Sequence, residues 1–247
     1  MSILELFLYL TFLNWSIITA LWFYCKKKNR LDLVGVYWSL GIVILTWSSM
    51  LFEALLEDPS LNFRQIFANI LVSIWGIRLS TYLASRGFWI EDPRYLSIKG
   101  EMEKEWTFKS YKNIFLYQGL VQLIILVPII YINFLPGPKN LNFLDYLGIF
   151  FFLVGFLVET KADLDLKQFR RLPGNESKVL KTGLWEYSRH PNYFGDILQW
   201  WGIYLLACNA VGGAWSFYGP LLMTWIFVKR SINTIENQLV LQRPGYD

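Results

Sequence analysis

Long apolar stretches alternate with short polar segments along almost the whole chain. A helix needs about 20 mostly apolar residues to cross roughly 30 Å of hydrocarbon, so each such stretch predicts a transmembrane helix. The predicted spans are residues 3–24, 34–55, 66–83, 114–134, 144–159, 193–208 and 215–227. The pattern therefore predicts an all-α, multi-pass membrane bundle of about seven helices.

Composition and charge agree with this interpretation. The chain is 54% apolar and 18% aromatic, well above an ordinary soluble domain. Lysine and arginine collect in cytoplasmic loops. Here, every basic residue except Arg64, Arg78 and Lys139 lies in the first, third or fifth predicted loop or in the C-terminal tail. The alternation predicts an amino terminus outside and a carboxyl terminus in the cytoplasm.

The net charge of +4 is first of all a signal of topology, and no arginine-rich stripe indicates a nucleic-acid partner. Cys25 and Cys208 fall at opposite membrane faces, so we expect neither a disulfide nor a metal site. The first span is followed by Lys26 to Lys28 and is predicted to be a retained helix rather than a signal peptide.

No repeat or linker divides the chain, so residues 1–247 are predicted to form one integral membrane domain embedded in the lipid bilayer. The chain stops at "QRPGYD", in a tail that still holds aromatic and charged residues. This ending predicts further residues beyond Asp247. Nothing in the sequence indicates the oligomeric state.

Arg78 lies inside the third predicted span, where a guanidinium is costly unless it faces a cavity or a partner, or reaches the interface. Tyr82 and Arg86 follow one and two turns later on the same face. Two interpretations stay open: Arg78 extends to the membrane surface along its apolar stem, or the stripe binds an anion.

The segment "YSRHPNYFGD" contains the only histidine of the chain, His190. Pro191 cannot continue a helix but suits the first turn of a new one, so the sixth span is predicted to start at or just after His190. This places Arg189, His190, Asn192 and free amide groups at the cytoplasmic surface. There the helix dipole favours phosphate or carboxylate.

Asp196 lies one turn further, as a carboxylate within an apolar span, and such residues are functional candidates. The structural alternative is that Asn192 and Asp196 satisfy helix ends while Tyr193 belongs to an interfacial aromatic belt. The fifth span continues as "ETKADLDLKQFRRLPG" and is predicted to break at Pro173 and Gly174. Along this extension, Asp163, Lys167 and Arg170 fall on one helical stripe.

Several segments resemble a known family. These segments are "GLWEYSRHPNYFGDILQWWGIYLLA", "ADLDLKQFR", "WGIRLSTYLASRGFWIEDPRY" and "GPLLMT". From about Asp32 onward, the chain resembles bacterial membrane proteins of the DUF1295 family, whose carboxyl-terminal half is similar to steroid 5-alpha-reductases and sterol reductases. The resemblance implies a bacterial inner-membrane location and a cofactor-binding region at about residues 113–247.

The resemblance further implies a reductase that binds NADPH from the cytoplasmic side and reduces a carbon-carbon double bond of a hydrophobic, lipid-like substrate. The cofactor-binding positions that it implies are Arg78, Asp163, Arg170, Arg189, His190, Asn192, Tyr193 and Asp196. Trp75 stands near the place where the steroid enzymes have their proton-donating tyrosine. Tyr82 and Glu53 are therefore the candidate catalytic residues.

NADPH carries a pyrophosphate and a 2′-phosphate, which arginines bind well. The arginines available on the predicted cytoplasmic side are Arg86, Arg94, Arg170, Arg171 and Arg189. No G-x-G-x-x-G follows a strand, which excludes a Rossmann site and leaves the cofactor among helices.

Two other classes stay open. "RHPNY" and the tail around Glu236 also resemble isoprenylcysteine carboxyl and phospholipid methyltransferases, which bind S-adenosylmethionine. That chemistry needs carboxylates near a sulfonium and makes no demand for phosphate-binding arginines. A lipid-binding or transport scaffold is the third class, because polar residues inside spans also mark solute pathways.

Overall fold

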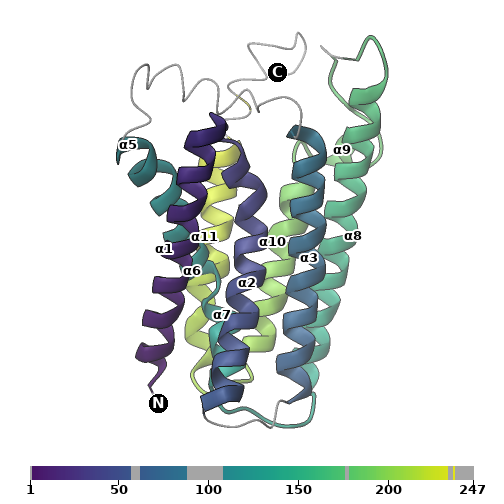
Figure 1. Cartoon of the computed structure of the whole chain (residues 1–247). Coiled ribbons are helices and arrows are strands. Elements are labelled where there is room, and N and C mark those ends of the chain that lie inside the picture. The colour runs from purple at the N-terminus through teal and green to yellow at the C-terminus, as the bar shows by residue number, and fades with distance from the viewer. Residues whose placement is uncertain (1, 57–61, 88–107, 176–177, 233–235, 237–247) are drawn as a thin grey trace. The chain divides into compact units, whose positions relative to one another are not determined.

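The computed structural model describes residues 2–56, 62–87, 108–175, 178–232 and 236 (Figure 1). All regular secondary structure within these ranges is helical, which confirms the predicted all-α class. The chain divides into two compact helical units, Met1–Lys139 and Asn140–Asp247. A single membrane domain covering residues 1–247 stays a prediction.

Helices occur at all seven predicted positions. Four of those in the described ranges are long and apolar enough to cross a membrane: α1 (Ile3–Lys28), α2 (Leu33–Leu56), α3 (Phe63–Gly87) and α8 (Phe143–Arg171). A bent pair of helices, 108–125 and 127–134, makes a fifth when counted as one span. The sixth position holds α10 (Pro191–Ala207), whose 17 residues lie at the lower limit for a span.

The seventh position is divided among three short helices, η2 (Gly213–Phe217), α11 (Tyr218–Trp225) and η3 (Ile226–Ser231). With its apolar helices, the chain is an integral membrane protein by length and composition. Which helix ends face the cytoplasm stays a prediction.

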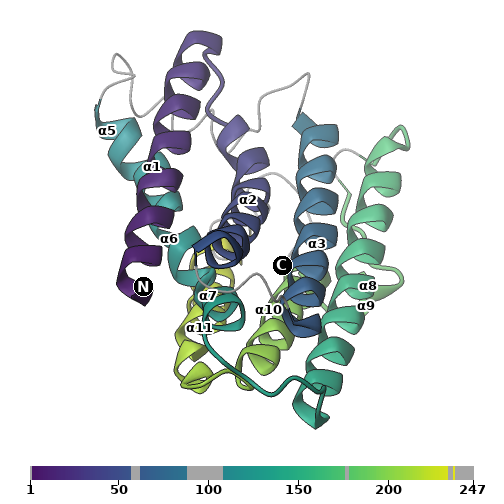
Figure 2. The same ribbon diagram turned by 60° about the horizontal axis from the view of Figure 1, so that its bottom comes forward.

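In the first unit, α2 packs against α1, α3, α6 (Tyr117–Ile125) and α7 (Val127–Phe134), as Figures 1 and 2 show. The start of α1 is fixed by a capping box, in which Ser2 and Glu5 each accept a hydrogen bond from the backbone of the other. Its end is fixed by Asn29, which adopts the left-handed conformation at φ 55°. Lys26 to Lys28 occupy the last turn, where the helix dipole favours positive charge.

The predicted fourth span is bent by 45°. It runs through α5 (Phe108–Ser110), η1 (Tyr111–Leu116), α6 (Tyr117–Ile125) and α7 (Val127–Phe134). Pro128 lies just after the bend at Leu126. Proline donates no backbone hydrogen bond and its ring collides with the preceding turn, which explains the change of direction.

A buried polar network joins α2, α3 and α7 where α2 ends and α3 begins. Asn133 Nδ2 donates to Ser49 Oγ at 2.8 Å, and Asn69 Nδ2 donates to Asn133 Oδ1 at 2.8 Å. Gln65 Nε2 donates to the Asn133 carbonyl at 2.8 Å. Because lipid offers no competing partners, interhelical hydrogen bonds of this kind hold membrane helices together, each contributing roughly 0.6–2 kcal/mol.

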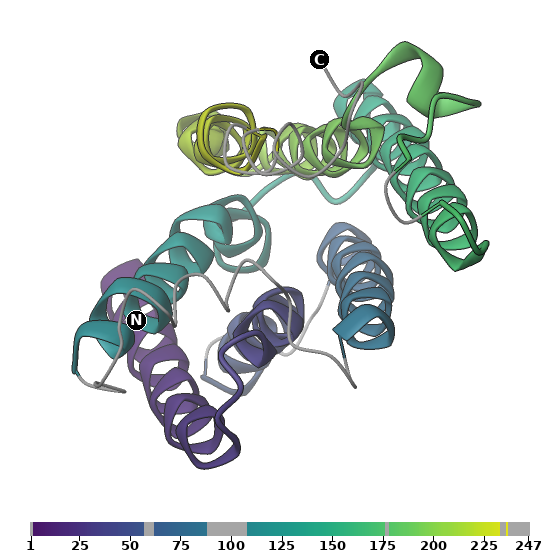
Figure 3. The same ribbon diagram turned by 90° about the horizontal axis from the view of Figure 1, so that it is seen from above.

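In the second unit, α8 and α10 lie side by side, as Figure 3 shows from above. Two glycine pairs set their separation. A Cβ added at Gly155 would lie 2.5 Å from the Gly195 carbonyl oxygen, and one at Gly148 would lie 2.6 Å from the Gly202 carbonyl oxygen. Small residues let membrane helices approach backbone to backbone. Each helix therefore presents two glycines seven residues apart, which is about two turns.

The ends of α8 follow from its sequence. Asn142 and Asp145 form a capping box at its start. The helix ends at Arg171, directly before Leu172, Pro173 and the left-handed Gly174 at φ 83°, so the predicted break is confirmed. Asp163 and Arg170 thus lie on one continuous helix with the apolar span.

Candidate cofactor site at the start of α10

The polar segment before α10 builds a helix start at the predicted place. His190 is the residue that precedes the helix, and Pro191 occupies the first helical position. The prediction that the sixth span begins at or just after His190 is confirmed. The Ser188 hydroxyl accepts a hydrogen bond from the His190 backbone at 3.2 Å, which holds the turn into α10. The first turn of α10 therefore presents backbone amides of the kind that bind anions.

The C-terminal part of α8, which follows its apolar stretch, runs beside this helix start. Asn192 Nδ2 donates a hydrogen bond to Asp163 Oδ1 at 3.1 Å, across 29 positions of sequence. Asp163 is only 2% exposed. Two residues that the resemblance assigns to the cofactor are thus in direct contact, and the amide holds the carboxylate in place.

Further buried polar side chains lie on the same two helices. Asp196, one turn beyond Asn192, is 3% exposed. Gln199 Nε2 donates to Glu159 Oε2 at 2.7 Å, and both side chains are buried. Asp163, Asn192, Asp196, Glu159 and Gln199 are called the α8–α10 polar cluster below. Buried polar groups inside a membrane are costly and mark functional sites by default.

Glu159 and Gln199 are not among the site residues predicted from the sequence. Glu159 ends the fifth predicted span, and Gln199 lies within an apolar run. A signal was present, because Glu159 lies four residues before Asp163 on the same helical face. Only the packing of α8 on α10 shows that Gln199 meets it.

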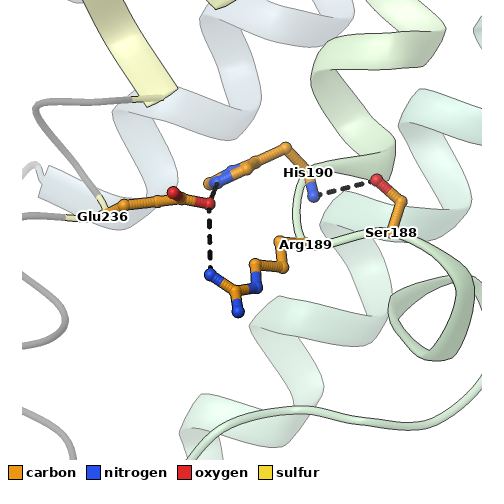
Figure 4. A network of polar contacts seen from close by, with 4 residues as sticks. All are labelled: Ser188, Arg189, His190 and Glu236. Atoms are coloured by element: carbon orange, nitrogen blue, oxygen red, sulfur yellow. Dashed lines mark hydrogen bonds and ion pairs between the residues drawn. The ribbon is translucent and has the colours of Figure 1, made fainter. Parts of the chain in front are cut away.

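At the rim of the site, two residues share the Glu236 carboxylate (Figure 4). His190 Nε2 lies 3.2 Å from Glu236 Oε1, and Arg189 Nη1 lies 3.8 Å from the same oxygen. The His190 ring stacks on Tyr193, with ring centroids 5.5 Å apart, and Tyr193 stacks on Phe227 at 4.6 Å. This aromatic stack orients the imidazole and connects the start of α10 to η3.

Burial lowers the pKa of His190 below its ordinary value of 6.5, and the nearby Arg189 charge acts in the same direction. The hydrogen bond and charge of Glu236 oppose this shift without cancelling it. His190 is therefore neutral at pH 7, and one ring nitrogen can donate to Glu236 while the other accepts.

The lowered pKa predicts a loss of stability in mild acid. In the unfolded chain the imidazole binds a proton near pH 6.5, whereas the folded chain resists protonation until a lower pH. The contribution of His190 to the free energy of unfolding is therefore present above about pH 6.5, and it is lost as the pH falls below that value. Because the chain contains one histidine, we expect His190→Gln to flatten the decline of the thermal midpoint between about pH 7 and pH 5.5 in detergent. An unchanged slope would contradict this assignment.

Only some of the arginines predicted to bind the cofactor lie within the described residues. Arg170 is exposed in the last turn of α8, two turns from Asp163. Arg86 lies near the end of α3, but its side chain falls outside the described residues, and so does the whole of Arg94. Arg78 is half-buried in the middle part of α3.

The two candidate catalytic residues lie at opposite ends of the first unit. Glu53 is near the end of α2, one turn beyond Ser49 of the Asn69–Asn133 network. Tyr82 is buried on α3, thirteen residues beyond Asn69. Because α2 and α3 run antiparallel, the four residues from Ser49 to Glu53 add to the thirteen from Asn69 to Tyr82. With a helical rise of 1.5 Å per residue, the two side chains are separated by about 25 Å along the helices. They cannot both act on one reacting atom.

A depression of about 430 Å³ lies on the other flank of α8. Its lining residues are Leu157, Val158, Lys161, Asp165, Gly183 and Leu184. The depression contains no predicted cofactor residue, so the candidate site rests on the contacts of the polar cluster.

No group of three or more His, Cys, Asp or Glu side chains suited to a metal occurs in the described part of the chain. A metal-free protein stays a prediction.

These observations define a helical integral membrane protein with a polar site between α8 and α10. The sequence profile of the DUF1295 family, whose description is "Protein of unknown function", matches residues 21–247. The chain therefore belongs to the DUF1295 family.

Known relatives match over a shorter segment. Human 3-oxo-5-alpha-steroid 4-dehydrogenase 1 is 32% identical over 72 residues, which is 29% of this chain and 28% of the human protein. The steroid 5-alpha-reductase DET2 of Gossypium hirsutum is 32% identical over 71 residues, 29% of this chain and 28% of that protein. The 3-oxo-5-alpha-steroid 4-dehydrogenase 1 of Bos taurus is 34% identical over 85 residues, which is 34% of this chain and 30% of the bovine protein. No solved structure gives a significant match.

Proposed function

We propose that this protein is a membrane reductase that uses NADPH to reduce a carbon-carbon double bond of a steroid-like or other apolar lipid. The relatives named 3-oxo-5-alpha-steroid 4-dehydrogenase and steroid 5-alpha-reductase support the reaction class. The observation that carries the proposal is the contact between Asp163 and Asn192 beside the start of α10. This contact brings together, in the second unit, two residues that the reductase resemblance assigns to the cofactor. We further propose a bacterial inner membrane as its location.

The residues at this site fit the two kinds of group that NADPH presents. Its amide and ribose hydroxyls need fixed hydrogen-bond partners, which the carboxylates and amides of the α8–α10 polar cluster provide. Its phosphates need cations and backbone amides, which Arg189, Arg170 and the first turn of α10 provide at the rim. When bound, the cofactor supplies a hydride.

Hydride addition to an enone also needs a proton donor. We propose Tyr82 as this donor, because a tyrosine hydroxyl is a common general acid, and Glu53 is the alternative. Glu53 lies near the end of α2. Trp75 is fully buried, with its ring against Trp38 at a centroid distance of 6.1 Å, and an indole is too weak an acid to take this role.

The methyltransferase alternative is favoured by one observation, the contact of Glu236 with His190 at 3.2 Å. A carboxylate at this position would attract the sulfonium of S-adenosylmethionine. Against it, the rim is also lined by Arg189 and lies at a helix start, both of which favour anions.

Cofactor binding separates the classes. The purified protein in detergent is titrated with NADPH and with S-adenosylmethionine, and binding is followed by isothermal calorimetry. We expect NADPH to bind. Its oxidation, followed as the loss of its ultraviolet absorbance, should depend on an added 3-oxo-4-ene steroid or another apolar enone. Binding of S-adenosylmethionine in its place would establish the methyltransferase. Binding of neither would favour a lipid-binding or transport scaffold.

An arginine substitution tests how the 2′-phosphate is bound. We expect Arg170→Ala to weaken NADPH about fivefold while leaving NADH nearly unchanged, since an exposed ion pair contributes up to about 1 kcal/mol. Dissociation constants for the two nucleotides are the readout. Lys161→Ala is the matched control, because it removes an exposed positive charge that pairs with Asp165 on the other flank of α8. Equal losses for NADPH and NADH would assign the 2′-phosphate to another residue.

A further inference from the structure

The Glu236 carboxylate lies where an anionic ligand of this site would be expected. One oxygen, Oε1, contacts both His190 Nε2 and Arg189 Nη1, the two groups at the rim that would bind a phosphate (Figure 4). Carboxylate and phosphate oxygens compete for the same donors.

We propose that Glu236 is a specificity-determining residue of the cofactor site, an internal competitor that phosphate must displace from Arg189 and His190. This inference rests on the proposed dinucleotide function. In this role Glu236 lowers the affinity of the site for anions. The methyltransferase alternative would instead have Glu236 raise the affinity for a cationic cofactor.

The ion pair between Arg189 and Glu236 is weak enough for a bound phosphate to displace Glu236. The Arg189 side chain is 54% exposed and that of Glu236 is 29% exposed. Solvent screens ion pairs at this level of exposure, so each contributes little and is readily exchanged. The neutral state of His190 at pH 7 weakens its bond to the carboxylate further.

The donors do not need Glu236 to keep their position. The His190 side chain is 11% exposed, and its ring is held by the stack on Tyr193 and Phe227. The His190 backbone is held separately by the Ser188 hydroxyl. Removal of the Glu236 charge should therefore leave the imidazole oriented and open to an incoming phosphate oxygen.

The test compares the full chain with its Glu236→Gln variant in detergent. We expect the variant to bind NADPH about two- to fivefold more tightly, the gain that corresponds to releasing an exposed ion pair. Glu186→Gln is the matched control, because it removes an exposed carboxylate three residues before Arg189 and should change the affinity less than twofold. Adding Arg189→Gln to the Glu236→Gln variant should cancel most of the gain.

Equal gains in the Glu236 and Glu186 variants would overturn the proposal, because they would reflect net charge rather than competition at Arg189. Weaker NADPH binding by Glu236→Gln would overturn it as well. A loss of affinity for S-adenosylmethionine in this variant, with no NADPH binding, would also overturn it in favour of the methyltransferase.

Titration with inorganic pyrophosphate separates this proposal from the reductase assignment. Tighter pyrophosphate binding by Glu236→Gln, with no NADPH binding by either protein, would support the competition and reject the reductase. Equal pyrophosphate affinities in a protein that does bind NADPH would reject the competition and keep the reductase.

Discussion

In an Asp196→Asn variant, we expect NADPH to bind about ten- to a hundredfold more weakly than in the unmodified protein. Hydrogen bonds to a charged group contribute about 1.5–3 kcal/mol, and the asparagine keeps the shape of the side chain while removing its charge. Asp196 is 3% exposed and lies one turn inside α10, next to the helix start that would receive the cofactor. The dissociation constant and the rate of NADPH oxidation with an enone lipid are the measurements.

Asp165→Asn is the matched control for Asp196→Asn. Asp165 lies on the other flank of α8, where it pairs with Lys161, and its replacement should change NADPH binding less than twofold. The thermal midpoint separates function from structure. We expect it to change little in Asp196→Asn, because asparagine keeps the size and shape of the side chain. A collapse of expression and folding would show that Asp196 has a structural role.

The Gly195→Ala variant is expected to lose about 1–3 kcal/mol of unfolding free energy. The added Cβ would lie 2.6 Å from the Glu159 backbone nitrogen and 2.6 Å from the Gly155 carbonyl oxygen, so the backbones of α8 and α10 must move apart. Helix propensity alone favours alanine over glycine by up to about 1 kcal/mol, so a loss can come only from packing. Unfolding in mixed detergent micelles, followed by tryptophan fluorescence, measures the change.

Two comparisons define the Gly195→Ala result. Leu157→Ala changes an exposed residue on the other flank of α8 and should alter stability by less than about 0.5 kcal/mol. Gly155→Ala combined with Gly195→Ala should cost less than the sum of the single losses, because both act on one contact. Full stability of Gly195→Ala would mean that α8 and α10 are not held at this distance. The same separation of α8 and α10 should also weaken NADPH, since it pulls Asn192 away from Asp163.

The helix positions were predictable because bilayer thickness imposes a length and a composition on each span. The start of α10 was predictable because Pro191 permits few alternatives, and so was the end of α8 before Pro173. The bend in the fourth span was missed, although Pro128 was visible, because proline inside an apolar run does not specify where the helix yields.

The candidate site was predicted only in part. Asp163 and Asn192 were selected separately, and the structure shows that one donates to the other. Glu159 and Gln199 were missed, because an amide in an apolar run has meaning only once its partner is known. Glu53 and Tyr82 were alternative candidates for the proton donor, and the antiparallel arrangement of α2 and α3 places them at opposite ends of these helices. Side chains distant in sequence meet through packing, which hydrophobic periodicity does not encode.

The amino-acid sequence by itself determined that this protein is helical and has the apolar helices of a membrane protein, where α10 starts and α8 ends, and which short segments hold its polar groups. These properties are local, since they depend on apolar length, on proline and on capping residues. Only the tertiary structure decided that Glu159 meets Gln199, that Asn192 holds Asp163 and that Glu236 reaches Arg189 and His190. Those contacts depend on how closely two glycine-bearing helices approach each other and on where the chain returns, and both are set by packing across long sequence separations.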